Sequence, residues 1–309
     1  MVMCDTIRSE KNTLVKNEWL SRYTQNLDTF LKEIDKSGSE TSPKVTTVPS
    51  EIITAINTID YKSDGNDTWK YLVLIECALF APYFAFNGEN EKAYKKLSMT
   101  SKTREIALIS ISKWLGIDYK FVEKVQKTYN VTTKKLTGYY TKVLISAVAG
   151  IAAAILTVAT MGGSIAAMFA ASGLYGAAAV SSGLAALGGG AIAAGGFGMA
   201  GGMAVLIGGG FLLGGSSGAA IGLTLASSNP KGVLSELSKL YVVLKEVILG
   251  KLHDIKRAQE IIGSVVDKIA EYKKEVARLK LEVEKNKERI KNLEKSIKYL
   301  EKFLGLNDD

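Results

Sequence analysis

VLISAVAGIAAAILTVATMG, residues 143–162, opens a stretch that contains no ionisable side chain. The stretch runs from Val143 to Pro230, and its 88 residues include no Asp, Glu, Lys, Arg or His. An apolar run of about 18 residues is already long enough to be a candidate transmembrane helix. We therefore predict that residues 143–230 form a membrane-spanning block of two or four helices.

Basic residues stand at both ends of this stretch. Those before it are Lys134, Lys135 and Lys142, and those after it are Lys231, Lys239 and Lys245. Lys and Arg are enriched on the cytoplasmic flanks of membrane spans. Because both flanks are basic, we expect both ends on one side of the bilayer and an even number of crossings. This predicts residence in the inner (cytoplasmic) membrane with both termini cytoplasmic, and makes the lipid bilayer the first expected partner.

Small residues recur every four positions in the second half of the stretch. The glycines in this register are Gly198, Gly202, Gly210, Gly214, Gly218 and Gly222. Residues four apart share one helix face, and a stripe of small residues lets two membrane helices approach closely. We predict that these glycines form a helix-packing interface, a glycine zipper. The alternative is a loosely folded, low-complexity spacer.

Residues 1–142 are predicted to form a helical domain on the cytoplasmic side that senses or regulates. Apolar side chains recur at three and four residues between Leu14 and Ile34, the spacing of an amphipathic helix. Residues 37–50 are rich in Ser, Thr and Pro and indicate a linker. Ser50 is a candidate cap for a short helix over residues 51–59.

The apolar run from Trp69 to Phe86 allows two interpretations. It is interrupted by Glu76 and Pro82, and its uninterrupted part is short. Apolar runs of 10–14 residues more often form a buried core helix than a membrane span. We favour a core helix, with Cys77 as a small buried side chain. The alternative is a further membrane segment, in which Glu76 would be functional.

Two amphipathic helices are expected next, over residues 101–115 and 118–129. Gly116 is the predicted C-terminal stop of the first and Asp118 the predicted N-cap of the second. The sequence REIALISISKWLGIDYKFVEKV, residues 104–125, following an apolar helix, resembles the small all-helical TerB-like domains of tellurite resistance. No acidic metal-site motif accompanies the resemblance, so it implies a fold only.

After residues 229–232, Asn-Pro-Lys-Gly, apolar residues return every seven positions from Leu234 to Leu304. This heptad spacing is typical of a coiled coil. We predict a coiled-coil oligomerisation helix over residues 231–309, about 100 Å long if it is continuous. The seam residues that we expect to mediate association are Ile269, Val276, Leu279, Val283, Asn286, Ile290, Leu293, Ile297 and Leu300.

Charges beside this seam favour a parallel, in-register homo-oligomer. The pairs Glu275/Lys280, Glu282/Lys287 and Arg289/Glu294 occupy positions that meet between parallel partners, and each pair is opposite in sign. Asn286 within the seam would fix the register. The alternative is that this part of the chain packs back on its own chain.

Residues suited to catalysis or metal binding are scarce. The sequence has one histidine, His253, and two cysteines, Cys4 and Cys77, with no metal-binding spacing. Residues 196–201 match GxGxxG without the strand and acidic residue that a dinucleotide site needs. We predict that the protein is not an enzyme and uses no cofactor or metal.

The sequence therefore predicts an all-α protein in three parts: a helical domain, a Gly/Ala-rich membrane block and a coiled coil. This layout resembles that of cell-killing membrane effectors in bacterial antiviral systems, including the channel component of Hailong-type systems. The resemblance implies a homo-oligomeric pore or ion channel that depolarises the cell. It also implies gating by an anionic nucleotide or oligonucleotide made by a partner enzyme, a ligand that suits the formal net charge of +8.

Two other functions stay open at this point. The first is a soluble-to-membrane pore-forming toxin, which stores the apolar block within its fold until activation. The second is a non-conducting membrane scaffold that tethers a partner through the long helix. A pool of water-soluble monomer would favour the toxin, and the absence of conductance would favour the scaffold.

Overall fold

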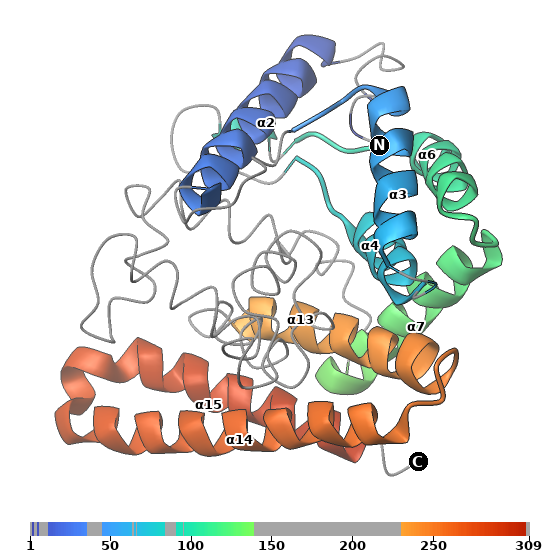
Figure 1. Cartoon of the computed structure of the whole chain (residues 1–309). Coiled ribbons are helices and arrows are strands. Elements are labelled where there is room, and N and C mark those ends of the chain that lie inside the picture. The colour runs from blue at the N-terminus through green and yellow to red at the C-terminus, as the bar shows by residue number, and fades with distance from the viewer. Residues whose placement is uncertain are drawn as a thin grey trace. The chain divides into compact units, whose positions relative to one another are not determined.

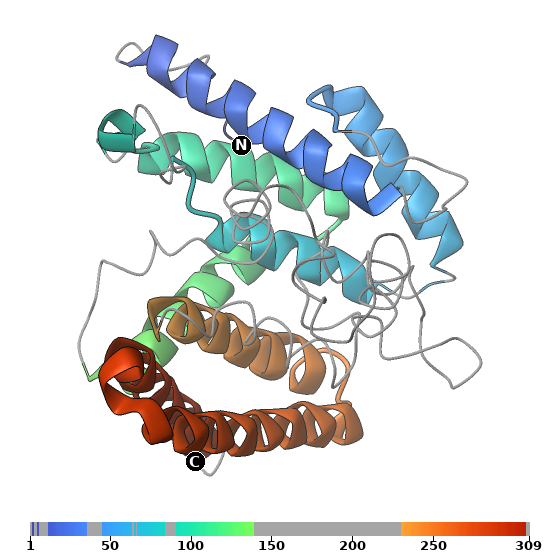
Figure 2. The same ribbon diagram turned by 90° about the vertical axis from the view of Figure 1, so that its left-hand side faces the viewer.

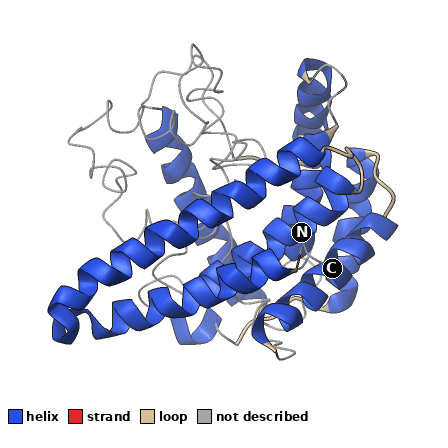
Figure 3. Ribbon diagram, turned by 90° about the horizontal axis from the view of Figure 1, so that it is seen from below, coloured by secondary structure: helices blue, strands red, loops and turns tan. Residues whose placement is uncertain are grey.

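The computed structural model describes residues 2, 5, 12–35, 45–63, 65, 67–83, 91–94, 96–138 and 230–306. Over these residues the chain is all-α and contains no strand (Figure 3), as the sequence predicts. The chain divides into two compact units: the described residues up to Val122 form the first, and those from Glu123 onward form the second. Each unit is described by itself.

The first unit is built from short helices around one apolar core. They are α2 (Thr13–Asp35), α3 (Pro49–Lys62), α4 (Thr68–Leu79), α5 (Glu91–Tyr94), α6 (Ser101–Leu115) and the first residues of α7 (Lys120–Thr137). Helix α4 packs on α6, and α2 packs on α5. Buried side chains in this core are Trp19, Leu72, Leu74, Ile75, Tyr94, Leu108, Leu115 and Val122.

Helix ends in this unit follow local chemistry. Gly116 adopts φ 68° at the end of α6, as predicted for a glycine stop. The Asp118 carboxylate accepts a 2.9 Å hydrogen bond from the Lys120 amide at the start of α7, which confirms its capping role. The predicted cap Ser50 is wrong: α3 begins at Pro49, which occupies the first turn, with Val48 before it. Proline fits there because the first turn needs no amide hydrogen.

Helix α4 resolves the two interpretations of residues 69–86. It has 12 residues, from Thr68 to Leu79, and buries Leu72, Leu74, Ile75 and Ala78. A helix of this length spans about 18 Å at 1.5 Å per residue, well short of a bilayer core of about 30 Å. The core-helix prediction is confirmed, and the alternative of a Glu76-bearing membrane segment is wrong.

The second unit contains the rest of α7 and the whole described C-terminal part. Its elements are α13 (Pro230–Val242), the π-helical η4 (Val243–Leu249), α14 (Ile255–Leu279), the short 3-10 turn η5 (Lys280–Glu282) and α15 (Val283–Gly305). Figures 1 and 2 show α14 and α15 side by side, joined at one end by η5. These two helices therefore form an antiparallel hairpin.

The structure differs here from the predicted single helix of about 100 Å. The chain breaks after Leu249 and reverses again at η5, so residues 230–306 form three packed segments. The heptad pattern is present, but it is satisfied by helices of the same chain. This corresponds to the alternative in which the segment packs back on its own chain.

The predicted location is also corrected. Among the described residues, no helix is both long enough and apolar enough to cross a membrane. This finding overturns the prediction of residence in the inner membrane with both termini cytoplasmic. Residues 143–229 of the predicted block lie outside the described residues, and so do all six glycines of the predicted packing stripe: Gly198, Gly202, Gly210, Gly214, Gly218 and Gly222.

Candidate functional site

The most informative site lies where the two flanks of the charge-free stretch meet. Helix α7 ends just before the stretch, and α13 begins with its last residue, Pro230. The Thr133 hydroxyl donates a 2.9 Å hydrogen bond to Ser238 Oγ, and the hydroxyls of Tyr129 and Ser235 lie 3.1 Å apart. The two ends of the stretch are thus held together by contacts between α7 and α13. We call these four residues the base seam.

The base seam is buried although it is polar. Thr133 is 4 % exposed, and Ser235 and Ser238 are at most 1 % exposed. Buried hydroxyls need hydrogen-bond partners, and these helices supply them to one another; Ser238 also donates to the Leu234 carbonyl at 2.9 Å. Each such bond contributes only about 1 kcal/mol net. The base seam therefore determines mainly which residues of α7 and α13 meet, and it adds little to the free energy of folding.

A buried carboxylate extends the contact between α7 and the segment after α13. Glu246 lies on η4 and is 2 % exposed. Thr128 donates a 2.7 Å hydrogen bond to its Oε1, and the Lys124 ammonium lies 2.7 Å from Oε2. A buried carboxylate without a counter-charge is strongly unfavourable. Glu246 therefore ties η4 to α7 only while Lys124 stays in place.

The π-helical turn that carries Glu246 is a rare element and often marks a functional position. It ends at Gly250, where a Cβ atom would lie 2.8 Å from the Lys245 carbonyl oxygen and 2.9 Å from that of Glu246. Only glycine fits so close to backbone atoms. The sequence analysis noted Gly250 only as a bend and did not predict the π-helix.

The C-terminal helix secures the end of α7 as well. The Lys302 ammonium donates a 2.9 Å hydrogen bond to the Leu136 carbonyl, in the last turn of α7. A cation there complements the negative end of the helix dipole. Helices α13 and α15 therefore both hold α7 close to the point where the charge-free stretch begins.

The predicted oligomerisation seam is largely occupied within the hairpin and its neighbours. Its buried members are Ile269, Val276, Leu279, Ile290, Leu293, Ile297 and Leu300. Val283, next to the η5 turn, is 47 % exposed. The Asn286 amide donates to the Glu282 carbonyl at 3.0 Å, and its predicted role in fixing the register of an oligomer stays a prediction.

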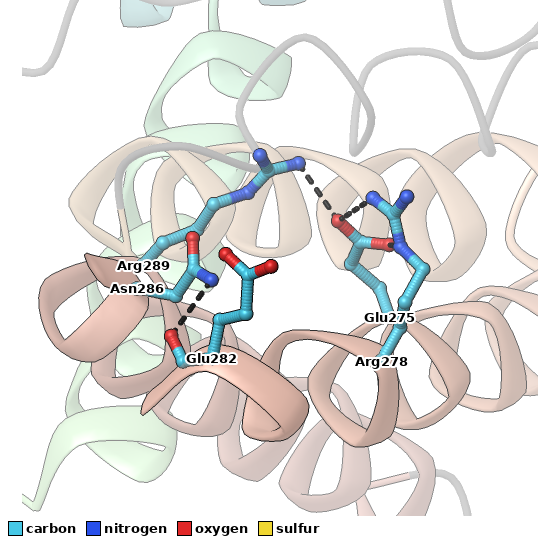
Figure 4. A network of polar contacts seen from close by, with 5 residues as sticks. All are labelled: Glu275, Arg278, Glu282, Asn286 and Arg289. Carbon is cyan, nitrogen blue, oxygen red and sulfur yellow. Dashed lines mark hydrogen bonds and ion pairs between the residues drawn. The ribbon is translucent and has the colours of Figure 1, made fainter. Parts of the chain in front are cut away.

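The charges that suggested a parallel oligomer are also used within the chain. Figure 4 shows Arg289 of α15 reaching Glu275 of α14, which also binds Arg278. Lys280 pairs with Glu294 at 2.9 Å. In the third pair, Glu282 lies 3.3 Å from Lys285, and Lys287 is exposed. Parallel self-association stays a prediction. The apolar seam and the charges that suggested it are mostly occupied by contacts within the chain.

Glu275 is the carboxylate with the most favourable surroundings in the hairpin. Its Oε1 and Oε2 accept hydrogen bonds of 2.9 Å from the Arg278 guanidinium, and Arg289 adds a third of 2.9 Å. The hydrogen bonds from Arg278, followed by the charges of Arg278 and Arg289, lower the pKa of Glu275 below its ordinary value of 4.5.

A second buried polar cluster lies in the first unit, where no sequence pattern indicates it. The Asp5 carboxylate accepts hydrogen bonds from the Lys16 ammonium, at 2.6 Å, and from the Tyr83 hydroxyl. All three side chains are buried, and Tyr83 has φ 66°. Burial and the bond to Asp5 raise the pKa of Tyr83. Contacts across 78 residues leave no trace in local spacing, so this anchor of the N-terminus was missed.

Comparison with known proteins adds no identity, because no protein family, curated protein or solved structure matches this chain. The resemblances to TerB-like domains and to antiviral membrane effectors stay predictions. Within the described ranges, no group of three or more His, Cys, Asp or Glu side chains could hold a metal ion.

Proposed function

We propose that the protein permeabilises lipid bilayers, with residues 143–230 as the inserting part and the helices on either side as its base. The base is α7, α13, η4 and the α14–α15 hairpin. The proposal concerns action on a bilayer. Copies assembled through the predicted glycine stripe would together enclose the pore.

One observation carries this proposal. The helices next to the 88-residue charge-free stretch are joined by the base seam, at Thr133–Ser238 and Tyr129–Ser235. A segment whose ends are held together can enter a bilayer only as an even number of crossings, with both ends on one face. An apolar stretch of this length gains free energy in lipid because its apolar side chains leave water, provided that helices satisfy the hydrogen bonds of its backbone.

A leakage assay tests the proposal. Purified full-length protein added to dye-filled vesicles should release the dye, and Gly214→Leu with Gly218→Leu should abolish release by separating the packed helices. The matched control is Gly263→Ala, a change on α14 where an added Cβ meets no atom within 4 Å. Absence of leakage and of conductance with wild-type protein would refute the proposed function.

A disulfide across the base seam tests the arrangement of the two ends. The hydroxyl oxygens of Thr133 and Ser238 are 2.9 Å apart, so cysteine sulfurs at these positions would need to approach by only about 1 Å to reach the S–S bond length of about 2.0 Å. Thr133→Cys with Ser238→Cys, in a background of Cys4→Ser and Cys77→Ser, should therefore cross-link on oxidation. Leakage should be unchanged in the oxidised form. If it disappears and returns on reduction, the base opens during insertion and the closed-base arrangement is wrong.

A further inference from the structure

The turn between η4 and α14, residues 249–257, presents apolar side chains outward. Leu249 and Leu252 are each 40 % exposed and Ile255 is 66 % exposed. Figure 1 shows this turn at the opposite end of α14 from η5. Three exposed aliphatic side chains within seven residues form a patch of the kind that usually contacts a partner or a membrane.

Cations surround these aliphatic side chains. Lys245, Lys251 and Lys256 are exposed, and Arg257 is partly exposed. The nearby Asp254 is engaged as the N-cap of α14, accepting a 2.9 Å hydrogen bond from the Arg257 amide. Glu246 is buried and paired with Lys124. Residues 249–257 therefore carry Lys251, Lys256 and Arg257 against the single carboxylate of Asp254, a net positive charge.

The position of two of these cations runs against helix stability. Lys256 and Arg257 lie in the first turn of α14, which has no acidic residue. Cations at a helix N-terminus are unfavourable because they face the positive end of the helix dipole. Contact with an anionic surface would offset this cost.

The turn is also held in one shape. The amides of Lys251 and Leu252 both donate to the Val247 carbonyl at 2.9 Å, and the Asp254 amide donates to the Ile248 carbonyl at 3.0 Å. His253 has φ 53°, a left-handed conformation that the surrounding bonds impose. The aliphatic side chains are thus presented by a preformed turn, and little ordering is needed on binding.

We propose that the 249–257 turn docks the protein on anionic lipid surfaces, with Leu252 and Ile255 entering the headgroup region and Lys251 and Lys256 meeting lipid phosphates. This inference rests on the proposed function, since it assigns the first contact with the bilayer that residues 143–230 then enter. Apolar side chains among cations fit an anionic bilayer better than a protein surface, because such combinations bind through burial and charge together.

Co-sedimentation with preformed vesicles tests the docking separately from leakage. Wild-type protein should bind phosphatidylcholine vesicles containing phosphatidylglycerol more tightly than vesicles of phosphatidylcholine alone. Lys251→Glu with Lys256→Glu should weaken binding to the anionic vesicles by about tenfold or more. A glutamate at position 256 suits the helix N-terminus, so lost binding cannot be attributed to unfolding.

A control pair and a second probe complete the test. Leu281→Ser with Lys298→Glu, at exposed positions away from the turn, should bind as wild type does. An environment-sensitive dye on Leu252→Cys, in the background of Cys4→Ser and Cys77→Ser, should brighten on anionic vesicles, and the same dye on Leu281→Cys should not.

Two results would overturn the docking proposal. The first is unchanged vesicle binding by the Lys251→Glu, Lys256→Glu variant. The second is loss of a discrete oligomer in this variant with normal vesicle binding, which would assign the turn to a second copy of the chain. In either case leakage by wild-type protein would leave the proposed function standing. Vesicle binding without leakage would instead refute the proposed function and leave the docking proposal standing.

Discussion

The base seam and the α14–α15 hairpin bury their contacting faces in different ways. The hairpin buries mainly aliphatic and aromatic side chains, with Lys268 as a buried cation paired with Glu271. Other charges lie at the rim, where Lys273 and Lys280 pair with Glu301 and Glu294. The base seam buries hydroxyls between α7 and α13, and beside it Glu246 is a buried carboxylate between α7 and η4. Apolar burial contributes most of the free energy of folding. Paired polar groups contribute little net free energy, but a buried polar group without its partner is costly, so these pairs disfavour other arrangements. The hairpin therefore supplies stability, and the base seam determines the register of the two flanks.

The largest effect is expected in the hairpin. Leu300 is fully buried, and Leu300→Ala should lower the free energy of unfolding by about 2–5 kcal/mol, because it removes apolar contacts and leaves a cavity. Chemical denaturation monitored by circular dichroism measures this change. Leu281→Ala, at a side chain that is 85 % exposed, is the control and should change stability by less than about 0.5 kcal/mol. Equal effects at the two positions would show that the hairpin does not form as described.

The ion pair of Glu246 should give the next largest effect. Lys124→Met leaves a buried carboxylate with only the Thr128 hydrogen bond. Lys124 is 62 % exposed, so water screens its charge and it stabilises Glu246 less than a fully buried partner would. We therefore expect the free energy of unfolding to fall by about 1–2 kcal/mol. Glu246→Gln added to Lys124→Met should recover much of it, since no charge then remains buried. A double variant less stable than Lys124→Met would contradict this pairing.

The hydroxyl pair should behave differently from an apolar contact. Ser238→Ala leaves the buried Thr133 hydroxyl without its acceptor and should cost about 1 kcal/mol, whereas Thr133→Val with Ser238→Ala should cost less than the single change. Thermal unfolding of the wild type, the single variants Thr133→Val and Ser238→Ala and the double variant measures this non-additivity. Additive losses would mean that the two hydroxyls do not form the bond seen here.

The same contrast explains what could be predicted from sequence. Helical spacing, the glycine at 116 and the cap at 118 are local signals, and the structure bears them out. The heptad pattern correctly marked the buried seam, but it is equally satisfied by a partner chain and by a hairpin. Charge pairs such as Glu275 with Arg289 fit both geometries. The reversal at residues 280–282 decides between a partner chain and a hairpin. Its sequence, Lys-Leu-Glu, contains neither Gly nor Pro and is typical of a helix.

Sites made by distant residues were beyond sequence reasoning for a related reason. Thr128 and Glu246 are 118 residues apart, and the local sequence around neither residue indicates the other. Their meeting depends on how α7 crosses η4, which local periodicity does not encode. The charge-free stretch between them is a local signal, whereas the pairing of the polar residues on its flanks is not.

The smallest effect, and the one with a pH signature, belongs to the rim of the hairpin. The pKa of Glu275 is lowered in the folded state by the hydrogen bonds of Arg278. Its contribution is therefore complete above its unfolded pKa, near 4.5, and is lost as the pH falls through the lower folded-state pKa. Because the arginines are mostly exposed, the effect should be below about 1 kcal/mol. Glu275→Gln should reduce the acid sensitivity of thermal unfolding, while Glu284→Gln, at an exposed position, should leave it unchanged. If both variants keep the wild-type pH profile, the charges at the rim do not stabilise the hairpin, and its apolar face alone holds α14 against α15.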